Sequence, residues 1–232
     1  MPASDSLSTG TVLIAVAPAL RRLVEVAARS VGLRHEHVGD ADLDNAVHRK
    51  APALVLTDAT RASYALDGRT VPVVVLVKGG VGPKVDALAL GAADVVGIPF
   101  DLQDLSVRIS AAIGRATGAY PRPVDGFGLG PVQIDLERNR LRINGIDLRL
   151  SPLEQRIFLV LAANDGDVAP REAILEAVWG PGMEPNSNLI DRHIRDLRRK
   201  LADDWRTPNY IVTVRGQGYS FRKDGGGTPT LS

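Results

Sequence analysis

The sequence predicts two domains of different fold class: an α/β domain with a doubly wound parallel sheet, and a smaller α+β domain of helices and a β-hairpin. Short apolar runs alternate with helical periodicity up to residue 117, and a segment rich in Gly and Pro follows. Three helix patterns and a hairpin pattern then fill residues 149–221. The length of 232 residues is enough for two domains of about 100 residues each.

The first domain is expected to alternate strands with helices. Its apolar runs predict strands at Thr11–Ala17, Leu54–Thr57, Val73–Val77 and Val95–Gly97. Apolar residues that recur three and four positions apart predict helices at Pro18–Val31, Leu43–Arg49, Pro83–Leu90 and Leu102–Ala116. Functional groups of parallel sheets gather beyond the carboxyl ends of the strands, which directs attention to Val16, Ala17, Asp58, Val77 and Ile98.

The segment GAYPRPVDGFGLG is the expected domain boundary, because Gly and Pro interrupt regular structure. We expect a linker at 118–127, a second domain at 128–223, and disordered tails at 1–10 and 224–232. Polar and apolar residues alternate at the start of the second domain, which predicts a small antiparallel sheet at Val132–Asp135, Arg140–Asn144 and Asp147–Leu150.

The helices of the second domain have clear signals. Ser151, Pro152 and Glu154 predict a helix N-terminus with a capping box. A second helix is expected at Arg171–Val178 and a third at Asn188–Leu201. The third helix carries an apolar stripe at Ile190, Ile194, Leu197 and Leu201. Its opposite side carries Asn188, Arg192, Arg195 and Arg199.

A basic helix face is by itself more often a solvated surface than a binding site. The hairpin predicted from Tyr210–Val214 and Gly218–Phe221 shifts this balance, because it places Arg215 at a tight, glycine-flanked tip. This layout is typical of a protein that puts a helix in the DNA major groove and a wing beside it. The net charge of +1 does not argue against DNA, because the cations clustered within 192–200 set the local field.

Motifs in both halves carry a resemblance to one family. LSPLEQRIFLVL, AVWG, DRHIRDLRRKL and TVRGQGYSF resemble the winged-helix effector domain of OmpR/PhoB-type response regulators, and ALVLTDAT, VPVVVLVKGG and LGAADVVGIPFDLQDLSVRI resemble the receiver domain that precedes it. The resemblance implies a (βα)5 receiver-like dimerisation domain at 11–117 and a winged helix-turn-helix domain at 128–223. It further implies a bacterial, sequence-specific transcriptional regulator that binds double-stranded promoter DNA, usually on direct repeats.

The resemblance also implies a set of DNA contacts, which comprises Trp179, Asn188, Arg192, His193, Arg195, Asp196, Arg198, Arg199, Arg215 and Tyr219. By family position, phosphates would be held by Asn188, His193 and Arg198. Bases would be faced by Arg195 and Asp196, and Arg215 would enter the minor groove. Asp196 stands where several relatives carry arginine. This departure matters because a carboxylate can accept from cytosine N4 but cannot pair with guanine O6 and N7. The loop at 180–187 would contact RNA polymerase.

The resemblance to receivers does not extend to their active site. Phosphoryl transfer from a histidine kinase needs an acceptor Asp, an acidic pair for Mg²⁺, a Thr or Ser, and a Lys. Asp58 occupies the acceptor position, but the other positions hold Val16, Ala17, Val77 and Ile98. We therefore expect that Asp58 is not phosphorylated and that a histidine kinase is not a partner.

Two alternatives stay open. Asp58 could be a working phosphoacceptor in a rearranged pocket, with Lys78 as the substitute cation. The apolar pocket could instead sense a small molecule.

The resemblance also implies contacts across a dimer interface. By family position, Lys84 would pair with Asp104 of the partner subunit, and Asp94 with Arg108 of the partner subunit, although ordinary exposed charges would look the same.

The composition excludes several classes of protein. The chain has no Cys, which excludes disulfides and thiolate chemistry and suits a cytoplasmic location. The longest apolar run, Val71–Val77, is too short to span a membrane, and no secretion signal is recognised. His35 and His37 would project to one side of a strand, but no carboxylate or cysteine stands at ligand spacing, so no metal is expected. Neither a cofactor nor an enzymatic activity is indicated by any motif.

Overall fold

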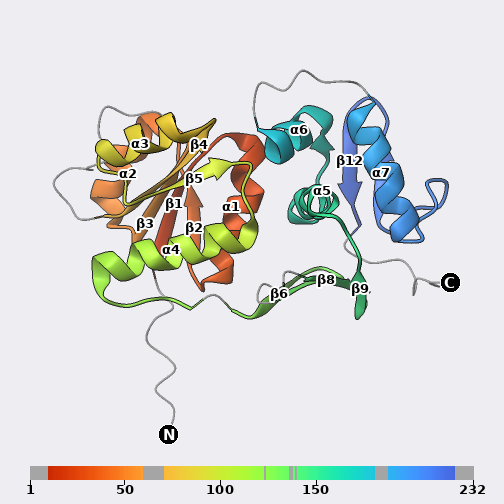
Figure 1. Ribbon diagram of the computed structural model, residues 1–232, viewed down its shortest axis with the longest axis horizontal. Helices are drawn as coiled ribbons and strands as arrows, with labels where there is room; N and C mark the ends of the chain where they lie inside the picture. The colour runs from red at the N-terminus through yellow and green to blue at the C-terminus, as the bar shows by residue number, and fades with distance from the viewer. Residues whose placement is uncertain are drawn as a thin grey trace, which may run out of the picture. The chain divides into compact units, whose positions relative to one another are not determined.

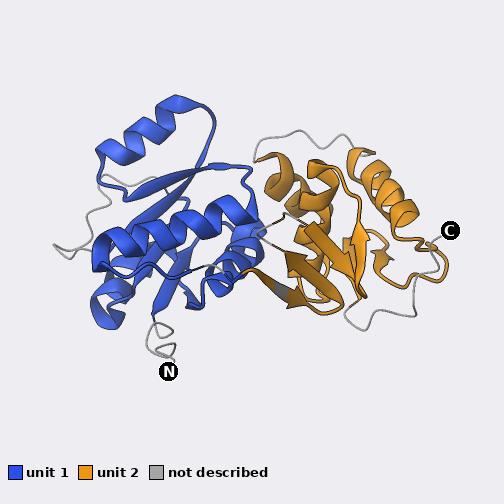
Figure 2. Cartoon of the chain, turned by 60° about the horizontal axis from the view of Figure 1, so that its bottom comes forward, with its two compact units in different colours: residues 1–124 blue, residues 125–232 orange. Residues whose placement is uncertain are grey.

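The computed structural model describes residues 10–59, 71–122, 124–135, 138, 140–180 and 188–222. The chain forms two compact units, residues 1–124 and 125–232, which are shown in different colours in Figure 2. The division lies inside the segment predicted as a linker, and both predicted tails lie almost entirely outside the described residues. Among the described residues, no helix is long and apolar enough to cross a membrane.

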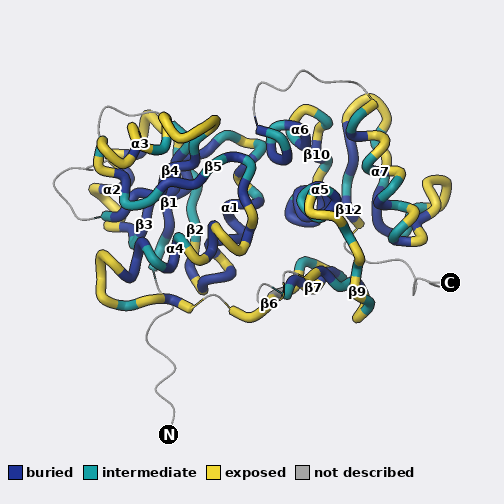
Figure 3. Tube along the Cα trace, viewed as in Figure 1, coloured by how far each residue is buried: buried dark blue, intermediate teal, exposed yellow. Residues whose placement is uncertain are grey.

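The first unit is built on a five-stranded sheet with the order β2-β1-β3-β4-β5, in which all neighbours are parallel (Figure 1). This confirms the predicted α/β class. The strands are β1 (Thr11–Ala15), β2 (Arg34–His37), β3 (Leu54–Thr57), β4 (Val73–Lys78) and β5 (Asp94–Ile98). The central strands are continuously apolar because both faces of the sheet are covered, as the dark core in Figure 3 shows.

Four α-helices of the first unit are described, together with a short 3-10 turn, η1 (Asp40–Asp42). They are α1 (Pro18–Ser30), α2 (Leu43–Lys50), α3 (Val81–Ala89) and α4 (Leu102–Thr117). Helices α1 and α4 pack on each other, whereas α2 and α3 contribute to an apolar cluster with β1, β3 and β4. A (βα)5 fold requires one more helix between β3 and β4, and residues 60–70, where it would fall, lie outside the described part of the chain.

The second unit has the predicted α+β class and two small antiparallel sheets. The first sheet contains β6 (Gly126–Leu129), β7 (Val132–Asp135), β8 (Arg140–Ile143) and β9 (Ile146–Leu148) in that order. Three helices follow, α5 (Pro152–Ala163), α6 (Arg171–Trp179) and α7 (Leu189–Lys200). The second sheet has the order β10-β12-β11, with β10 (Ala169–Pro170), β11 (Ile211–Val214) and β12 (Gly218–Phe221). This is a winged-helix arrangement.

Three strands lie outside the runs predicted from the sequence. Strand β2, with the sequence RHEH, has no apolar residue and so was not among the predicted apolar runs. Strand β6 begins at residue 126, inside the segment that was predicted to be the linker. It was not predicted because the glycines of this segment suggested a loop. A Cβ at Gly126 would lie 2.6 Å from the carbonyl oxygen of Ile134, so the close approach of β7 requires glycine there. Strand β10 was missed because it has two residues, one of them a proline, and pairs only with β12.

The predicted helix signals are present. Ser151 Oγ accepts from the amide of Glu154, and the Glu154 carboxylate accepts from the amide of Ser151, which completes the capping box of α5. The apolar stripe of α7 is buried, with Ile190, Ile194 and Leu197 at most 2% exposed. Packing of this stripe fixes the rotation of α7 and thereby decides which of its side chains face solvent.

Candidate functional sites: the nucleic-acid interface and the Asp58 pocket

The outer face of α7 is cationic and open. Arg192, Arg195 and Arg199 are exposed, on the side of the helix opposite the buried stripe. Arg199 forms an ion pair of 3.3 Å with Asp196, one turn earlier. Arg192 and Arg195 form no ion pair with any residue that the structure describes. These two guanidinium groups are therefore available to an external acceptor.

A hollow of about 450 Å³ lies at the N-terminal part of α7. It is lined by Asn188, Leu189, Asp191, Arg192 and Arg195. Asn188 occupies the N-cap position, but its side chain makes no capping hydrogen bond. The amide of Asn188 and the two arginines thus form a polar, mostly cationic surface at the end of the helix that would enter a groove first.

The β11–β12 hairpin presents an exposed tip. Its turn is closed by the amide of Gln217, which donates to the carbonyl oxygen of Val214 at 3.0 Å. Gly216 has a φ of 74°, a left-handed conformation that glycine adopts without strain. Arg215, Gly216 and Gln217 are all exposed. The hairpin therefore holds Arg215 at its outermost point, as the sequence predicted.

Arg198 is used within the protein. Its Nη2 donates to the carbonyl oxygen of Ile211 at 2.7 Å and to Thr213 Oγ1 at 2.9 Å, and its Nε is buried without a described partner. Arg198 therefore connects α7 to the first strand of the hairpin. The family resemblance implied a phosphate contact for Arg198, and the sequence gave no sign of this internal role.

Tyr219 is also placed differently from its predicted DNA contact. It is 4% exposed, and its hydroxyl donates to Asp191 at 2.5 Å, while Arg171 donates to Asp191 at 3.1 Å and stacks over the tyrosine ring at 4.9 Å. Burial, helped by the negative charge of Asp191, raises the pKa of Tyr219 to about 12. This cluster ties α6, α7 and β12 together, so Tyr219 is a structural residue. Sequence reasoning missed it because its members are far apart in the chain.

Two further sets of interactions stabilise α7 and the loop that follows it. Lys200 donates to the buried Glu154 at 2.6 Å, which links the end of α7 to the start of α5. Burial acts to raise the pKa of Glu154, but the bonds from Lys200 and Ser151 outweigh it and hold that pKa below its ordinary value. Asp203 accepts from the amides of Asn209, Tyr210 and Ile211, and so shapes the loop between α7 and the hairpin.

Trp179, which was predicted to contact DNA, lies beside α7. The rings of Trp179, at the end of α6, and His193, on α7, are 5.8 Å apart between centroids. Both side chains are partly exposed. The loop that follows Trp179, proposed from the resemblance to contact RNA polymerase, lies outside the described residues after Gly180.

A second candidate site lies at the carboxyl ends of the strands of the first unit. A pocket of about 420 Å³ is lined mainly by apolar side chains, with Asp58, Lys78 and Asp86 as its charged members. Asp58 Oδ2 accepts from the backbone amide of Ala17 at 2.8 Å. Ala17 stands at one of the two positions where the resemblance implies acidic Mg²⁺ ligands, and the bond that it forms with Asp58 comes from its backbone amide.

The residues around Asp58 do not fit a Mg²⁺ ion. Val16 is buried and apolar, Ile98 is 9% exposed, and Val77 lines the pocket in place of a hydroxyl. Among the described residues, Asp58 belongs to no group of three side chains able to share a metal. Mg²⁺ requires several oxygen ligands in near-octahedral geometry, and this pocket supplies one carboxylate to that position.

The four residues predicted at a dimer interface lie on α3, β5 and α4. Arg108 bonds Asp94 and Asp104 within the same chain, each at 3.0 Å, and Arg115 pairs with Asp94 at 3.6 Å. The Lys84 Nζ lies 3.0 Å from where a Cβ would stand at Gly97, so its side chain reaches β5. Three of the four predicted charges are thus already paired inside one subunit.

The same region exposes apolar side chains. Val81, Val85 and Leu88 follow one another along one face of α3, and Val107 lies on α4, each at least 50% exposed. The two helices flank the edge strand β5. The three side chains on α3 form an exposed apolar stripe close to charged residues, which is typical of an interaction surface.

Comparison with known proteins agrees with this architecture. Residues 145–221 match the family described as "Transcriptional regulatory protein, C terminal". The chain is 32% identical over 194 residues to the transcriptional regulatory protein PrrA of Mycobacterium leprae, covering 79% of this chain and 82% of PrrA. It is 30% identical over 214 residues to the DNA-binding response regulator MtrA of Mycolicibacterium smegmatis, covering 87% and 92%.

A solved structure is also similar in part. The DNA-binding domain of RstA from Klebsiella pneumoniae, determined in complex with the RstA box, is 29% identical, with a TM-score of 0.37, and covers 43% of this chain and 99% of that one. The fold, the family match and the relatives together define a response regulator with a DNA-binding effector domain, and thus a transcriptional regulator. The chain belongs to the OmpR/PhoB-type response regulators.

Proposed function

We propose that this protein regulates transcription as a homodimer that reads specific promoter sequences without phosphorylation of Asp58. The helix α7 lies in the major groove and Arg215 enters the adjacent minor groove. The observation that carries the proposal is the outward face of α7, where Arg192 and Arg195 are exposed and unpaired among the described residues beside an exposed arginine tip. DNA supplies the acceptors that these guanidinium groups lack.

The contact roles divide along α7. Arg195 and Asp196 face bases, whereas Arg192, His193 and Arg199 lie where they reach phosphates, and Trp179 packs behind His193. Asn188 holds a phosphate near the start of the helix. Because Asp196 is ion-paired with Arg199, its carboxylate is partly neutralised and can face a cytosine N4 donor without opposing the phosphates.

The groove assignment is tested by comparing three arginine substitutions in DNA selection and binding assays. Arg195→Ala should cost about 1–3 kcal/mol at one base-pair position and relax the preference there. Arg199→Ala should weaken binding uniformly on all sequences and reduce the salt dependence. Arg49→Ala, an exposed arginine of the first unit, is the control and should change neither. If Arg195→Ala leaves both affinity and preference intact, α7 is not the reading helix.

Independence from phosphorylation is supported by the bond between Asp58 and the Ala17 amide and by the replacement of the other catalytic positions. Incubation with acetyl phosphate and Mg²⁺, followed by intact-protein mass measurement, should give no added phosphoryl group. A mass increase that disappears in Asp58→Asn would overturn this part of the proposal. On this proposal a histidine kinase is not a partner, and DNA affinity is the same before and after such treatment.

The homodimer is supported by the apolar face of α3 and Val107, with the paired charges around it. Such a dimer places two effector domains on one duplex, which suits direct repeats in a promoter. RNA polymerase is the expected protein partner through the loop after Gly180, and the lack of cysteines favours a cytoplasmic location.

A second candidate function rests on the pocket at Asp58. Its volume of about 420 Å³ and its mostly apolar lining are those of a small-molecule site. A metabolite bound there would stabilise the first unit and shift its unfolding temperature. A thermal-shift screen in the wild type, repeated with Val77→Glu to fill and charge the pocket, tests it: stabilisation that the substitution leaves unchanged would exclude this pocket.

A further inference from the structure

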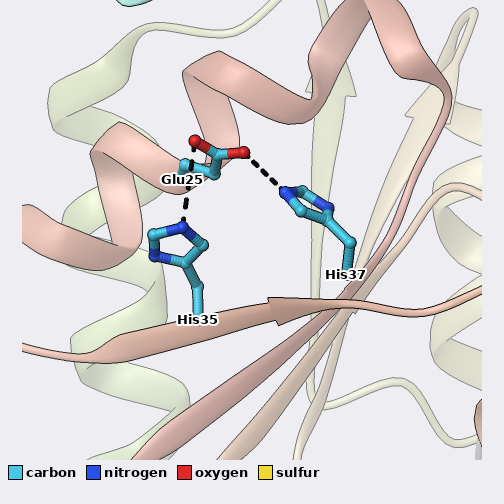
Figure 4. A group of neighbouring side chains, drawn as sticks. All are labelled: Glu25, His35 and His37. Carbon is cyan, nitrogen blue, oxygen red and sulfur yellow. Dashed lines mark hydrogen bonds and ion pairs between the residues drawn. The ribbon is translucent and has the colours of Figure 1, made fainter.

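Two histidines and a glutamate converge at the edge of the first sheet (Figure 4). His35 and His37 lie on the edge strand β2, two positions apart, so their rings project to the same face. Glu25 reaches them from α1, with Oε1 2.5 Å from His37 Nε2 and Oε2 3.8 Å from His35 Nε2. The sequence predicted no carboxylate near these histidines, and this was wrong because the fold brings α1 over β2.

The cluster is partly enclosed. The side chain of Glu25 is 6% exposed, and those of His35 and His37 are 25% and 30% exposed. Both Nε2 atoms point at the carboxylate, and His37 Nδ1 is buried without a described partner. Within the described part of the chain, this is the one group of three whose potential ligand atoms all lie within 4.8 Å of one another.

We propose that Glu25, His35 and His37 bind a divalent transition-metal ion of the zinc class through two imidazole Nε2 atoms and one carboxylate. Zinc bonds of about 2.0–2.1 Å in a tetrahedron place neighbouring ligand atoms roughly 3.4 Å apart. The separations of 2.5 Å to Oε1 and 3.8 Å to Oε2 bracket this value, and all three ligand atoms lie within 4.8 Å of one another, so adjustments of the side chains alone can form the site. The exposed edges of the imidazoles leave the fourth position to water.

Two arginines oppose the ion. Arg22 and Arg29 lie 3.3 and 3.7 Å from Glu25 Oε2 and balance its charge in the metal-free protein. Their side chains are 42% and 50% exposed, so both can swing into solvent when a cation takes the carboxylate. Removing either arginine should therefore strengthen metal binding. If the cluster serves only as an ion-pair network, the same substitution would weaken the cluster and would not improve metal binding.

A bound ion would connect the edge strand to α1. Strand β2 pairs with β1 alone, and its other edge is free within the described sheet. A metal bridge from β2 to α1 would add a link across this edge and stabilise the first unit against unfolding. The proposal concerns a site separate from the DNA-reading surface and from the Asp58 pocket, and it does not depend on either.

The test titrates the full-length, tag-free, chelator-stripped protein with Zn²⁺ alone against a chromophoric competitor, and with Co²⁺ as a spectroscopic probe. The wild type should bind one ion per chain. His35→Gln, His37→Gln and Glu25→Gln should each weaken binding at least about tenfold. His48→Gln, the same change at an exposed histidine of α2, should bind like the wild type, and Arg29→Gln should bind about two- to fivefold more tightly.

Thermal unfolding in excess chelator separates loss of ligand from loss of fold. His35→Gln is the mildest substitution, because its ring lies 3.8 Å from the carboxylate, and it should unfold like the wild type when metal is absent. Zn²⁺ should raise the unfolding temperature of the wild type and of His48→Gln, and leave that of His35→Gln unchanged. A wild type that binds no ion, or a folded His35→Gln that binds and responds like the wild type, overturns the proposal.

Discussion

At the scale of single residues, neighbouring arginines of α7 have separate tasks. Arg195 points outward and has no partner among the described residues, whereas Arg198 is bonded to Ile211 and Thr213 of the hairpin. Three residues along an α-helix rotate a side chain by about 300°, so Arg198 lies roughly 60° around the helix from Arg195, nearer the buried stripe and the hairpin. The basic cluster at 192–200 is thus partly a binding surface and partly a structural connection.

Arg198→Ala should lower the free energy of unfolding of the second unit by about 1.5–3 kcal/mol, because it removes two hydrogen bonds from a charged donor. Chemical denaturation of the full chain, followed by a signal from the second unit, measures this. Arg192→Ala on the open face should cost less than about 0.5 kcal/mol and serves as the control. Equal stability of the two variants would contradict the structural role of Arg198.

At the scale of elements, the hairpin depends on a close approach that only glycine permits. A Cβ at Gly218 would lie 2.1 Å from the carbonyl oxygen of Ala169, on strand β10. Strand β12 is held between β10 and β11, so neither neighbour can move away without breaking the ladder. The two-residue strand β10 therefore helps to set the position of the wing, together with the bonds from Arg198 and Tyr219.

Gly218→Ala should destabilise the second unit by about 3 kcal/mol or more, through the clash with β10. Gly216→Ala is the matched control: its Cβ would meet nothing within 4 Å, and only the left-handed φ of 74° opposes it, at about 1 kcal/mol. Equilibrium unfolding of both variants tests the order. A Gly216→Ala that is the less stable of the two would show that turn strain, not packing, limits the hairpin.

The link between α5 and α7 should depend on pH. The pKa of Glu154 in the folded chain lies below its ordinary value of 4.5, so its stabilising contribution is present above that value and is lost as the pH falls through the folded pKa. Glu154→Gln should cost about 1 kcal/mol or more near pH 7. Urea unfolding at pH 7 and below pH 4 should show this difference shrinking, whereas a constant difference would exclude the charge as its source.

At the scale of the whole molecule, the proposed homodimer would join two chains through the first unit and so link dimerisation to DNA binding. The exposed apolar side chains of α3 and α4 in the first unit are not covered by other described residues. The charged side chains near them are paired within one chain. Association would bury the apolar groups and leave the charges as a rim. Because rim charges contribute little free energy, the apolar stripe is expected to supply most of the dimer stability.

Val85→Lys should abolish cooperative binding to a pair of tandem half-sites, while binding to a single half-site stays unchanged. Val124→Lys is the control, since Val124 is an exposed valine outside this face. Sedimentation velocity and DNA titrations of the two variants measure the effect. Cooperative binding by Val85→Lys at the wild-type level would locate the dimer contact elsewhere.

Local pattern was sufficient for much of the fold. The alternation of strands and helices, the capping box at Ser151, the buried stripe of α7 and the exposed Arg215 were all readable from the sequence, because periodicity and turn chemistry act over a few residues. The family motifs then identified the effector domain. Strand β6 was hidden because glycine in a strand resembles glycine in a loop.

What tertiary structure decided is the set of partners that come from distant parts of the chain. The sequence could not show that Arg198 bonds to the hairpin, that Tyr219 is buried against Asp191 and Arg171, or that Glu25 lies between two histidines. Each of these pairings joins elements that only packing brings together. Spacing along one element determines which face a side chain occupies, and the opposing element determines what that side chain meets.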